Sequence, residues 1–197
     1  MKKILIAVPT FETILPDTFK SIYGLSKPDD CCTQFDFIKG YDCAKARCAI
    51  AKEALEYNFD YVLMVDSDII LPSNALCSLL SRDVDICLGF YPRKNTVTGQ
   101  SEVFKLGQHD FVDVYHYSEI PENECFEVKG GGLGCALIRA DIFGTLPYPY
   151  FRYVVYNNDS CLSEDNYFCS IAYTAGYKIY ADSAVRCGHS TRSFIWE

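Results

Sequence analysis

The sequence predicts an α/β fold with a mostly parallel, doubly wound, Rossmann-like sheet flanked by helices. Short apolar runs alternate along the chain with segments whose apolar residues recur at helical spacing. Two of the runs, residues 4–8 and 61–65, are continuous and rich in β-branched or aromatic residues. Such runs are typical of strands buried on both faces of a parallel sheet. The repeated order of strand and helix therefore favours parallel pairing.

Each element has a local signal. Pro16 is suited to the first turn of a helix, Asp42 and Ser163 are N-cap residues, and Gly176 is a stop. The polar, glycine-containing segment 93–108 is expected to form a hairpin or an excursion over the sheet. We expect strands at residues 4–8, 35–38, 61–65, 84–91 and 177–180 and within 127–138, and helices from residue 16, at 42–57, from about residue 72 and at 163–175.

The composition indicates one globular domain. The chain has 197 residues, of which 49% are hydrophobic. Its net charge of −8 disfavours nucleic acid as a partner, because phosphate backbones select basic surfaces. Eleven cysteines form no C-x-x-C pair, so structural zinc has little support, and an odd number excludes a complete disulfide set. A reducing cytoplasm is the expected location.

The amino terminus does not predict a leader or an anchor. The apolar segment 4–8 is shorter than the core of a signal peptide, and Pro9 follows it without a small-residue cleavage site. No run approaches 18 apolar residues, so no transmembrane segment is expected.

Two carboxylates follow the predicted strand 61–65. Asp66 and Asp68 would lie at the crevice where open α/β sheets place their ligands. The two charges repel unless a cation lies between them, and carboxylate oxygens suit Mg²⁺ or Mn²⁺. The sequence therefore indicates a divalent metal site, with a solvated Asp-rich turn as the alternative.

Seven motifs in a fixed order cover nearly the whole chain: IAVPTFE (6–12), AKARCAIAKEAL (44–55), VLMVDSD (62–68), LGFYPRK (88–94), GGGLGCALIRADIF (130–143), SEDNYFC (163–169) and CGH (187–189). In this order they resemble the glycosyltransferases with the GT-A fold, particularly the inverting family-two type. The resemblance implies one domain over 1–197, with a nucleotide-binding half, 1–92, and an acceptor and metal half, 93–197. It also implies a hexosyltransferase-class enzyme that moves a sugar from a nucleotide-sugar, here a UDP-sugar, to a hydroxyl acceptor.

The resemblance also implies a metal site and a general base. His189 joins Asp66 and Asp68 as a metal ligand, and an imidazole favours Mn²⁺ over Mg²⁺. The base is expected at Asp165, with Glu164 holding the acceptor or a donor hydroxyl. The alternative for these two acids is a favourable interaction with the positive end of a helix dipole.

A further set of residues is expected at the donor. Pro9, Thr10, Phe11 and Glu12 match the segment that cradles base and ribose in the family. Arg47 matches an arginine that reaches the nucleotide, although Lys45 and Lys52 nearby also fit a charged helix surface. The remaining expected donor contacts are Asp66, Ser67 and Arg192.

The glycines in VKGGGLGCALI, residues 128–138, precede a predicted strand. A dinucleotide fingerprint needs glycines after a strand and before a helix, so this segment is not one. Its glycines would let the backbone approach a ligand or another strand closely, and a plain bulge or turn is the alternative.

Other functions compete with glycosyl transfer. A haloacid-dehalogenase-like phosphatase shares the strand-DxD pattern, but it places that strand near the amino terminus. A nucleotidyltransferase would need a Gly-rich basic loop after strand one, and a non-catalytic nucleotide-sugar-binding module would not need its acids. Only residues 190–197 follow His189, so the acceptor site must come from segment 93–108, from a partner subunit as in a homo-oligomer, or from another chain.

Overall fold

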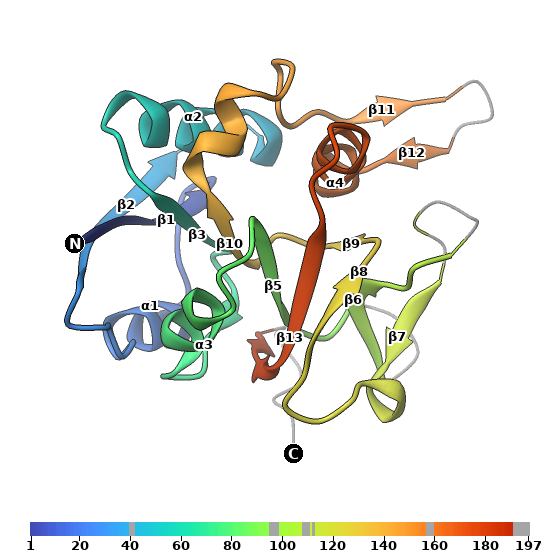
Figure 1. Cartoon of the computed structure of the whole chain (residues 1–197), viewed down its shortest axis with the longest axis horizontal. Coiled ribbons are helices and arrows are strands. Elements are labelled where there is room, and N and C mark those ends of the chain that lie inside the picture. Colours follow the sequence, from blue (N-terminus) through green and yellow to red (C-terminus); the bar gives the residue numbers. More distant parts are fainter. Residues whose placement is uncertain (40–41, 95–98, 108–110, 112, 157–159, 191–197) are drawn as a thin grey trace.

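A mixed seven-stranded sheet forms the centre of the molecule, with helices on both faces (Figure 1). The structure is a computed structural model that describes residues 1–39, 42–94, 99–107, 111, 113–156 and 160–190. Across the sheet the strands are β2 (Cys31–Lys39), β1 (Lys2–Thr10), β3 (Tyr61–Val65), β10 (Cys135–Arg139), β5 (Ile86–Phe90), β13 (Ile179–Arg186) and β8 (Cys125–Val128).

Five of the seven strands point in the same direction, as expected for a mostly parallel sheet, but only three of the six strand pairs are parallel. β2, β1 and β3 run parallel to one another, and so do β5 and β13. β10 is antiparallel to both of its neighbours, and β8 is antiparallel to β13. β3 is buried along its whole length, which explains its continuous apolar run. Because β10 and β13 come from the second half of the chain, both halves contribute to one sheet.

Within the described residues, four α-helices cover the sheet: α1 (Pro16–Tyr23), α2 (Cys43–Glu56), α3 (Ala75–Ser81) and α4 (Glu164–Thr174). α2 and α4 pack on one face, and α1 and α3 pack on the other (Figure 1). The predicted caps are present, because Asp42 accepts a hydrogen bond from the Lys45 backbone N–H and Ser163 accepts one from that of Asn166. Two short 3₁₀ helices complete the set: η1 (Tyr117–Glu119) and η2 (Ala140–Gly144).

In the part of the chain that the structure describes, three small sheets lie beside the central one. β6 (Gln100–Phe104) pairs with β7 (Val114–His116) and β9 (Gly130–Gly131), so the predicted excursion at 93–108 contains a strand. The other two pairs are β11 (Val154–Val155) with β12 (Cys161–Leu162), and β4 (Ile69–Ile70) with β14 (Gly188–His189). The last pair brings the carboxyl end of the described chain back to the DSD motif.

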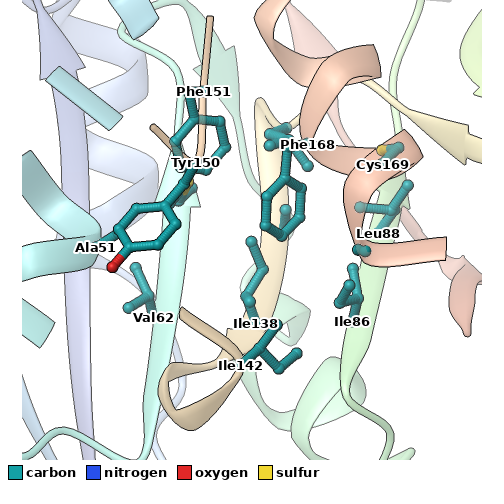
Figure 2. Packing of buried hydrophobic residues seen from close by; sticks show 14 of the residues in the cluster. Ala51, Val62, Ile86, Leu88, Ile138, Ile142, Tyr150, Phe151, Phe168 and Cys169 are labelled. Carbon is teal, nitrogen blue, oxygen red and sulfur yellow. The ribbon is translucent and has the colours of Figure 1, made fainter. Parts of the chain in front are cut away.

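The core between the sheet and helices α2 and α4 is aromatic (Figure 2). Phe151 and Phe168 stack with their ring centroids 4.9 Å apart, and Phe143 packs against both rings. Val62 of β3 and Ile138 of β10 belong to the same buried cluster as these rings (Figure 2). Aromatic packing therefore holds the amino-terminal end of α4 at a defined position over the sheet.

The last strand of the main sheet was predicted too short. It was expected at 177–180, whereas β13 runs from Ile179 to Arg186. Its second half contains the polar residues Asp182 and Ser183, which are buried. Arg82 and Ser78 satisfy Asp182, so these polar residues are accommodated in a strand with no continuous apolar run.

All eleven cysteines lie within the described residues and are free thiols. Over the same described ranges, no helix is both long enough and apolar enough to cross a bilayer.

Candidate active site

A cleft of about 610 Å³ opens at the carboxyl ends of β1, β3 and β5. Six of the predicted site residues line it: Pro9, Asp66, Ser67, Asp68, Asp165 and His189. The structure thus gathers residues that are up to 180 positions apart in the sequence. Five other predicted residues are described but do not line the cleft: Thr10, Phe11, Glu12, Arg47 and Glu164. Arg192 lies outside the described residues.

Three of the four residues predicted to cradle the nucleotide base and ribose do not line the cleft. Thr10 is buried, and its hydroxyl donates a hydrogen bond to the Thr13 carbonyl at 2.6 Å. Phe11 is 72% exposed, and Glu12 is also exposed. Only Pro9 of the predicted base and ribose contacts lines the cleft, so nucleotide contacts by the other three stay a prediction.

Arg47 lies beneath the cleft as a buried cation. It projects from the first turns of α2, and its side chain is 1% exposed. Its Nη1 and Nη2 donate hydrogen bonds to Asp66 Oδ1 at 3.3 and 2.9 Å. Its Nε lies 3.1 Å from Asp165 Oδ1 and 3.9 Å from Glu164 Oε1. The guanidinium therefore joins the acid after β3 to both acids at the start of α4.

Burial and neighbouring charges shift the pKa values in this cluster in opposite directions. Burial alone would lower the pKa of Arg47, but the carboxylates of Asp165, Asp66 and Glu164 raise it well above its ordinary value. Burial raises the pKa of Asp66, although Arg47 opposes this effect. The expected role of Arg47 as a nucleotide contact stays a prediction, and its observed contacts are with these acids.

Asp165 has a pKa near neutrality. Loss of solvation raises the pKa of Asp165 to about 7, against the opposing effect of Arg47. Its Oδ2 accepts a hydrogen bond from the Leu133 backbone N–H at 3.2 Å. The side chain is 17% exposed and lines the cleft, whereas that of Glu164 is 9% exposed. Asp165 is therefore the better placed of the two to meet a ligand and exchange a proton.

Asp68 lies between an imidazole and an ammonium. His189 Nε2 is 3.5 Å from Asp68 Oδ1, and Lys94 Nζ donates a hydrogen bond to Asp68 Oδ2. Burial alone would raise the pKa of Asp68, but hydrogen bonds with His189 and Lys94 outweigh it and lower the pKa. β14 positions His189 through its pairing with β4, and the Ser190 backbone N–H donates to the Asp68 carbonyl at 2.8 Å.

The orientation of His189 fits a metal ligand. Its Nδ1 lies 2.6 Å from the Pro92 carbonyl oxygen. A carbonyl only accepts, so Nδ1 donates to Pro92 and Nε2 is left facing Asp68. Metal-binding histidines commonly use such a backbone contact to fix their tautomer. Within the described ranges, however, no three His, Cys, Asp or Glu side chains converge as a ready metal site, and Asp66 is engaged by Arg47.

Lys94 and Tyr91 are among the cleft residues that carried no role in the sequence-based prediction. Lys94 stood in the motif LGFYPRK, and its position after a strand end was the signal that could have identified it. Tyr91 of the same motif is buried and lines the cleft. Its hydroxyl accepts a hydrogen bond from the Gly134 backbone N–H at 3.0 Å, and its ring meets that of His189 edge-on at 5.4 Å. Tyr91 therefore links the glycine-rich segment to the predicted metal ligand.

The glycine-rich segment approaches another strand closely, which is one of the two close approaches that the sequence predicted for it. β9 pairs with β6, and the Gly132 N–H donates to the Glu102 carbonyl at 2.9 Å. A Cβ on Gly132 would lie 2.0 Å from the Tyr91 hydroxyl oxygen. The absence of a side chain at this position therefore lets Tyr91 reach Gly134.

Gly132→Ala is expected to displace Tyr91 and to lower the free energy of unfolding by about 1–3 kcal/mol, the usual cost of overpacking. Urea denaturation measures this change. Gly107→Ala is the matched control, because a Cβ there meets no atom within 4 Å, and we expect it to stay within about 0.5 kcal/mol of the original protein. Equal effects of the two substitutions would contradict the proposed close packing.

Comparison with known proteins identifies the fold. Neither the protein-family models nor the curated proteins gave a match to this sequence. Among solved structures, A197 from STIV superposes with a TM-score of 0.67 at 18% identity, over 97% of this chain and 86% of that one.

Two longer proteins contain the same architecture. GalNAc-T7, solved with UDP, GalNAc and Mn²⁺, gives a TM-score of 0.60 at 10% identity, over 95% of this chain and 44% of that one. TarS 1-349 of S. aureus gives 0.56 at 16% identity, over 96% of this chain and 60% of that one. This chain thus spans less than two thirds of either. At such low identities the likeness concerns the fold, and the conclusion is that this chain has the GT-A fold of glycosyltransferases.

Proposed function

We propose that this protein is a metal-dependent glycosyltransferase that moves a hexosyl group from a UDP-sugar to a hydroxyl acceptor with inversion. One observation carries the proposal: a single cleft presents Asp68 and His189 together with Asp165, an acid whose pKa is raised to about 7. A cation-binding pair and a near-neutral base are the two groups that transfer from a diphosphate donor requires. The GT-A fold of the chain supports the same assignment.

Asp165 is proposed as the general base. A base works best when its pKa lies near the working pH, and loss of solvation brings Asp165 to that range. The Leu133 N–H and Arg47 hold its carboxylate at the edge of the cleft. There it would accept the proton of the acceptor hydroxyl as that oxygen attacks the anomeric carbon, and the donor would lose its diphosphate from the opposite face.

Asp68 and His189, with Asp66, are proposed to hold the metal, Mn²⁺ in preference to Mg²⁺ because of the imidazole. When bound, the metal would act as a Lewis acid that neutralises the charge developing on the diphosphate. Asp66 reaches this role only if it shares its carboxylate with Arg47, which binds its Oδ1 and not its Oδ2.

The cleft wall beside Asp165 is proposed to receive the acceptor. Ser163 and Asn166 of this wall supply polar groups, and Phe104 and Phe111 supply aromatic faces of the kind on which sugar rings stack. Phe104 belongs to the strand β6 inside the predicted excursion, in line with the expectation that this segment contributes to the acceptor site. Eleven free thiols support a cytoplasmic location, and a second subunit could complete the acceptor site.

The test is a thermal-shift titration with UDP and UDP-sugars, with Mn²⁺ and then with chelator. A ligand that binds only the folded state raises the apparent stability, by about 2.7 kcal/mol at a hundred times its Kd. We expect stabilisation that requires both UDP and Mn²⁺, and Asp68→Ala is expected to remove it while the protein stays folded.

Equal stabilisation by UDP in chelator would contradict metal dependence. Release of UDP from a UDP-sugar separates a transferase from a non-catalytic binding module, and release of phosphate from phosphate monoesters would point to the haloacid-dehalogenase alternative. The GT-A fold gives that alternative no support.

A further inference from the structure

Three residues in the segment that follows β5 contact Asp68 or its neighbour His189. Tyr91 packs its ring against His189, the Pro92 carbonyl accepts a hydrogen bond from His189 Nδ1, and Lys94 donates a hydrogen bond to Asp68. These three residues lie within four positions of one another. One short stretch of backbone therefore positions the imidazole and also supplies a positive charge to the carboxylate beside it.

The two oxygens of Asp68 have different partners. Oδ1 lies 3.5 Å from Nε2 of His189, and Oδ2 accepts the hydrogen bond from Lys94. A carboxylate oxygen and an imidazole nitrogen are both groups that bind divalent cations. The ammonium on the other oxygen already neutralises much of the carboxylate charge. It would therefore repel a divalent cation that binds at Oδ1 and Nε2.

Lys94 is also able to leave Asp68. Its side chain is 42% exposed and lines the cleft, and its four-carbon stem is flexible. The ammonium binds phosphate as a compact point charge. An anionic diphosphate in the cleft would attract Lys94 and return the full negative charge of Asp68 to a metal.

We propose that Lys94 makes metal binding at Asp68 and His189 conditional on the diphosphate of the donor. Without nucleotide, the ammonium competes with the metal for Asp68, and with nucleotide it pairs with the diphosphate. The inference rests on the proposed function, since it presumes a diphosphate ligand and a metal in this cleft. Its consequence is that UDP and Mn²⁺ bind cooperatively, with Lys94 as the source of a large part of the coupling.

Arg93 provides a matched control. It also lines the cleft and carries one positive charge, but its Nε pairs with Glu102 Oε2 at 3.2 Å and not with Asp68. Lys94→Met and Arg93→Met remove the same charge from neighbouring positions. A difference between these variants therefore reports the contact with Asp68 and not the net charge of the cleft.

The experiment is calorimetric titration of Mn²⁺ into the original protein, Lys94→Met, Arg93→Met and His189→Ala, each with and without UDP. Without UDP, we expect Lys94→Met to bind Mn²⁺ about tenfold more tightly than the original protein, with a much smaller change for Arg93→Met. UDP is expected to tighten Mn²⁺ binding to the original protein by about tenfold, within the usual range of coupling between sites, and to do so far less in Lys94→Met.

Equal Mn²⁺ affinity of Lys94→Met and the original protein would overturn the inference, and so would an equal gain in Arg93→Met. In either case, loss of Mn²⁺ binding in His189→Ala would show that the metal site itself stands. If no Mn²⁺ binds to any variant, with or without UDP, the inference fails together with metal dependence. An assay of UDP release from a UDP-sugar would then test sugar transfer separately.

Discussion

Asp165→Asn is expected to lower sugar transfer by about a hundredfold or more, the range for loss of a positioned general base. Asparagine has nearly the same shape as aspartate and can still accept the Leu133 hydrogen bond, but its amide cannot take up a proton at neutral pH. We therefore expect the affinity for donor to change little. Single-turnover transfer rates and UDP-sugar affinities, measured on the same preparations, separate these two effects.

The pH profile gives an independent test of the same residue. The base must be ionised to act, and its ionised fraction rises as the pH rises through its pKa. Because burial raises the pKa of Asp165 to about 7, transfer should rise through about pH 7 and not near pH 4. The residual transfer rate of Asp165→Asn should not show this rise through about pH 7.

Glu164→Gln is the matched comparison, since Glu164 precedes Asp165 and also lies near Arg47. We expect a milder effect, because Glu164 does not line the cleft. If Glu164→Gln is inactive while Asp165→Asn transfers at the original rate, the base is Glu164. Normal transfer by both variants would exclude the inverting mechanism proposed here.

Arg47→Met is expected to lower the free energy of unfolding by about 3–5 kcal/mol, the cost of removing one partner of a buried ionic cluster. The substitution leaves Asp66 and Asp165 without their shared cation, and both have pKa values that burial already raises. Chemical denaturation at pH 7 measures the loss. Arg47→Lys keeps the charge but loses the fork that contacts both acids, so we expect an intermediate loss.

The loss in Arg47→Met should depend on pH. Without the guanidinium, the pKa values of the two acids in the folded state rise further above their unfolded values. A group of this kind contributes stability at low pH that is lost as the pH rises through its folded-state pKa. The difference between Arg47→Met and the original protein should thus be smallest near pH 4 and should grow through pH 7.

Arg82→Met provides the control for a buried acid elsewhere. Arg82 pairs with the buried Asp182, but Asp182 also accepts hydrogen bonds from the Ser78 hydroxyl and the Ala184 N–H. Because Asp182 keeps two other hydrogen-bond partners, we expect Arg82→Met to lower the free energy of unfolding by less than Arg47→Met does. Equal losses from Arg47→Met and Arg82→Met would contradict a special role for the Arg47 cluster.

Periodicity and local chemistry identified most elements before the structure was known. β3 has the bounds expected from its continuous apolar run, and α2 and α4 begin after the predicted caps Asp42 and Ser163. These features depend on residues close in sequence. β13 was predicted too short because its buried polar residues are stabilised by Arg82 and Ser78 from another part of the chain.

By itself, the sequence determined the mostly parallel α/β sheet and the placement of Asp66 and Asp68 at the end of a buried strand. Only the tertiary structure decided what these acids contact. The pairing of β14 with β4 brings His189 to Asp68, and the packing of α2 against the sheet turns Arg47 inward to join Asp66 with Asp165. Lys94, in the segment after β5, likewise contacts Asp68 only in the folded chain. The physical reason is that strand and helix signals act over a few residues, whereas the protonation and partners of buried charges depend on neighbours up to 121 positions away, as for His189 and Asp68.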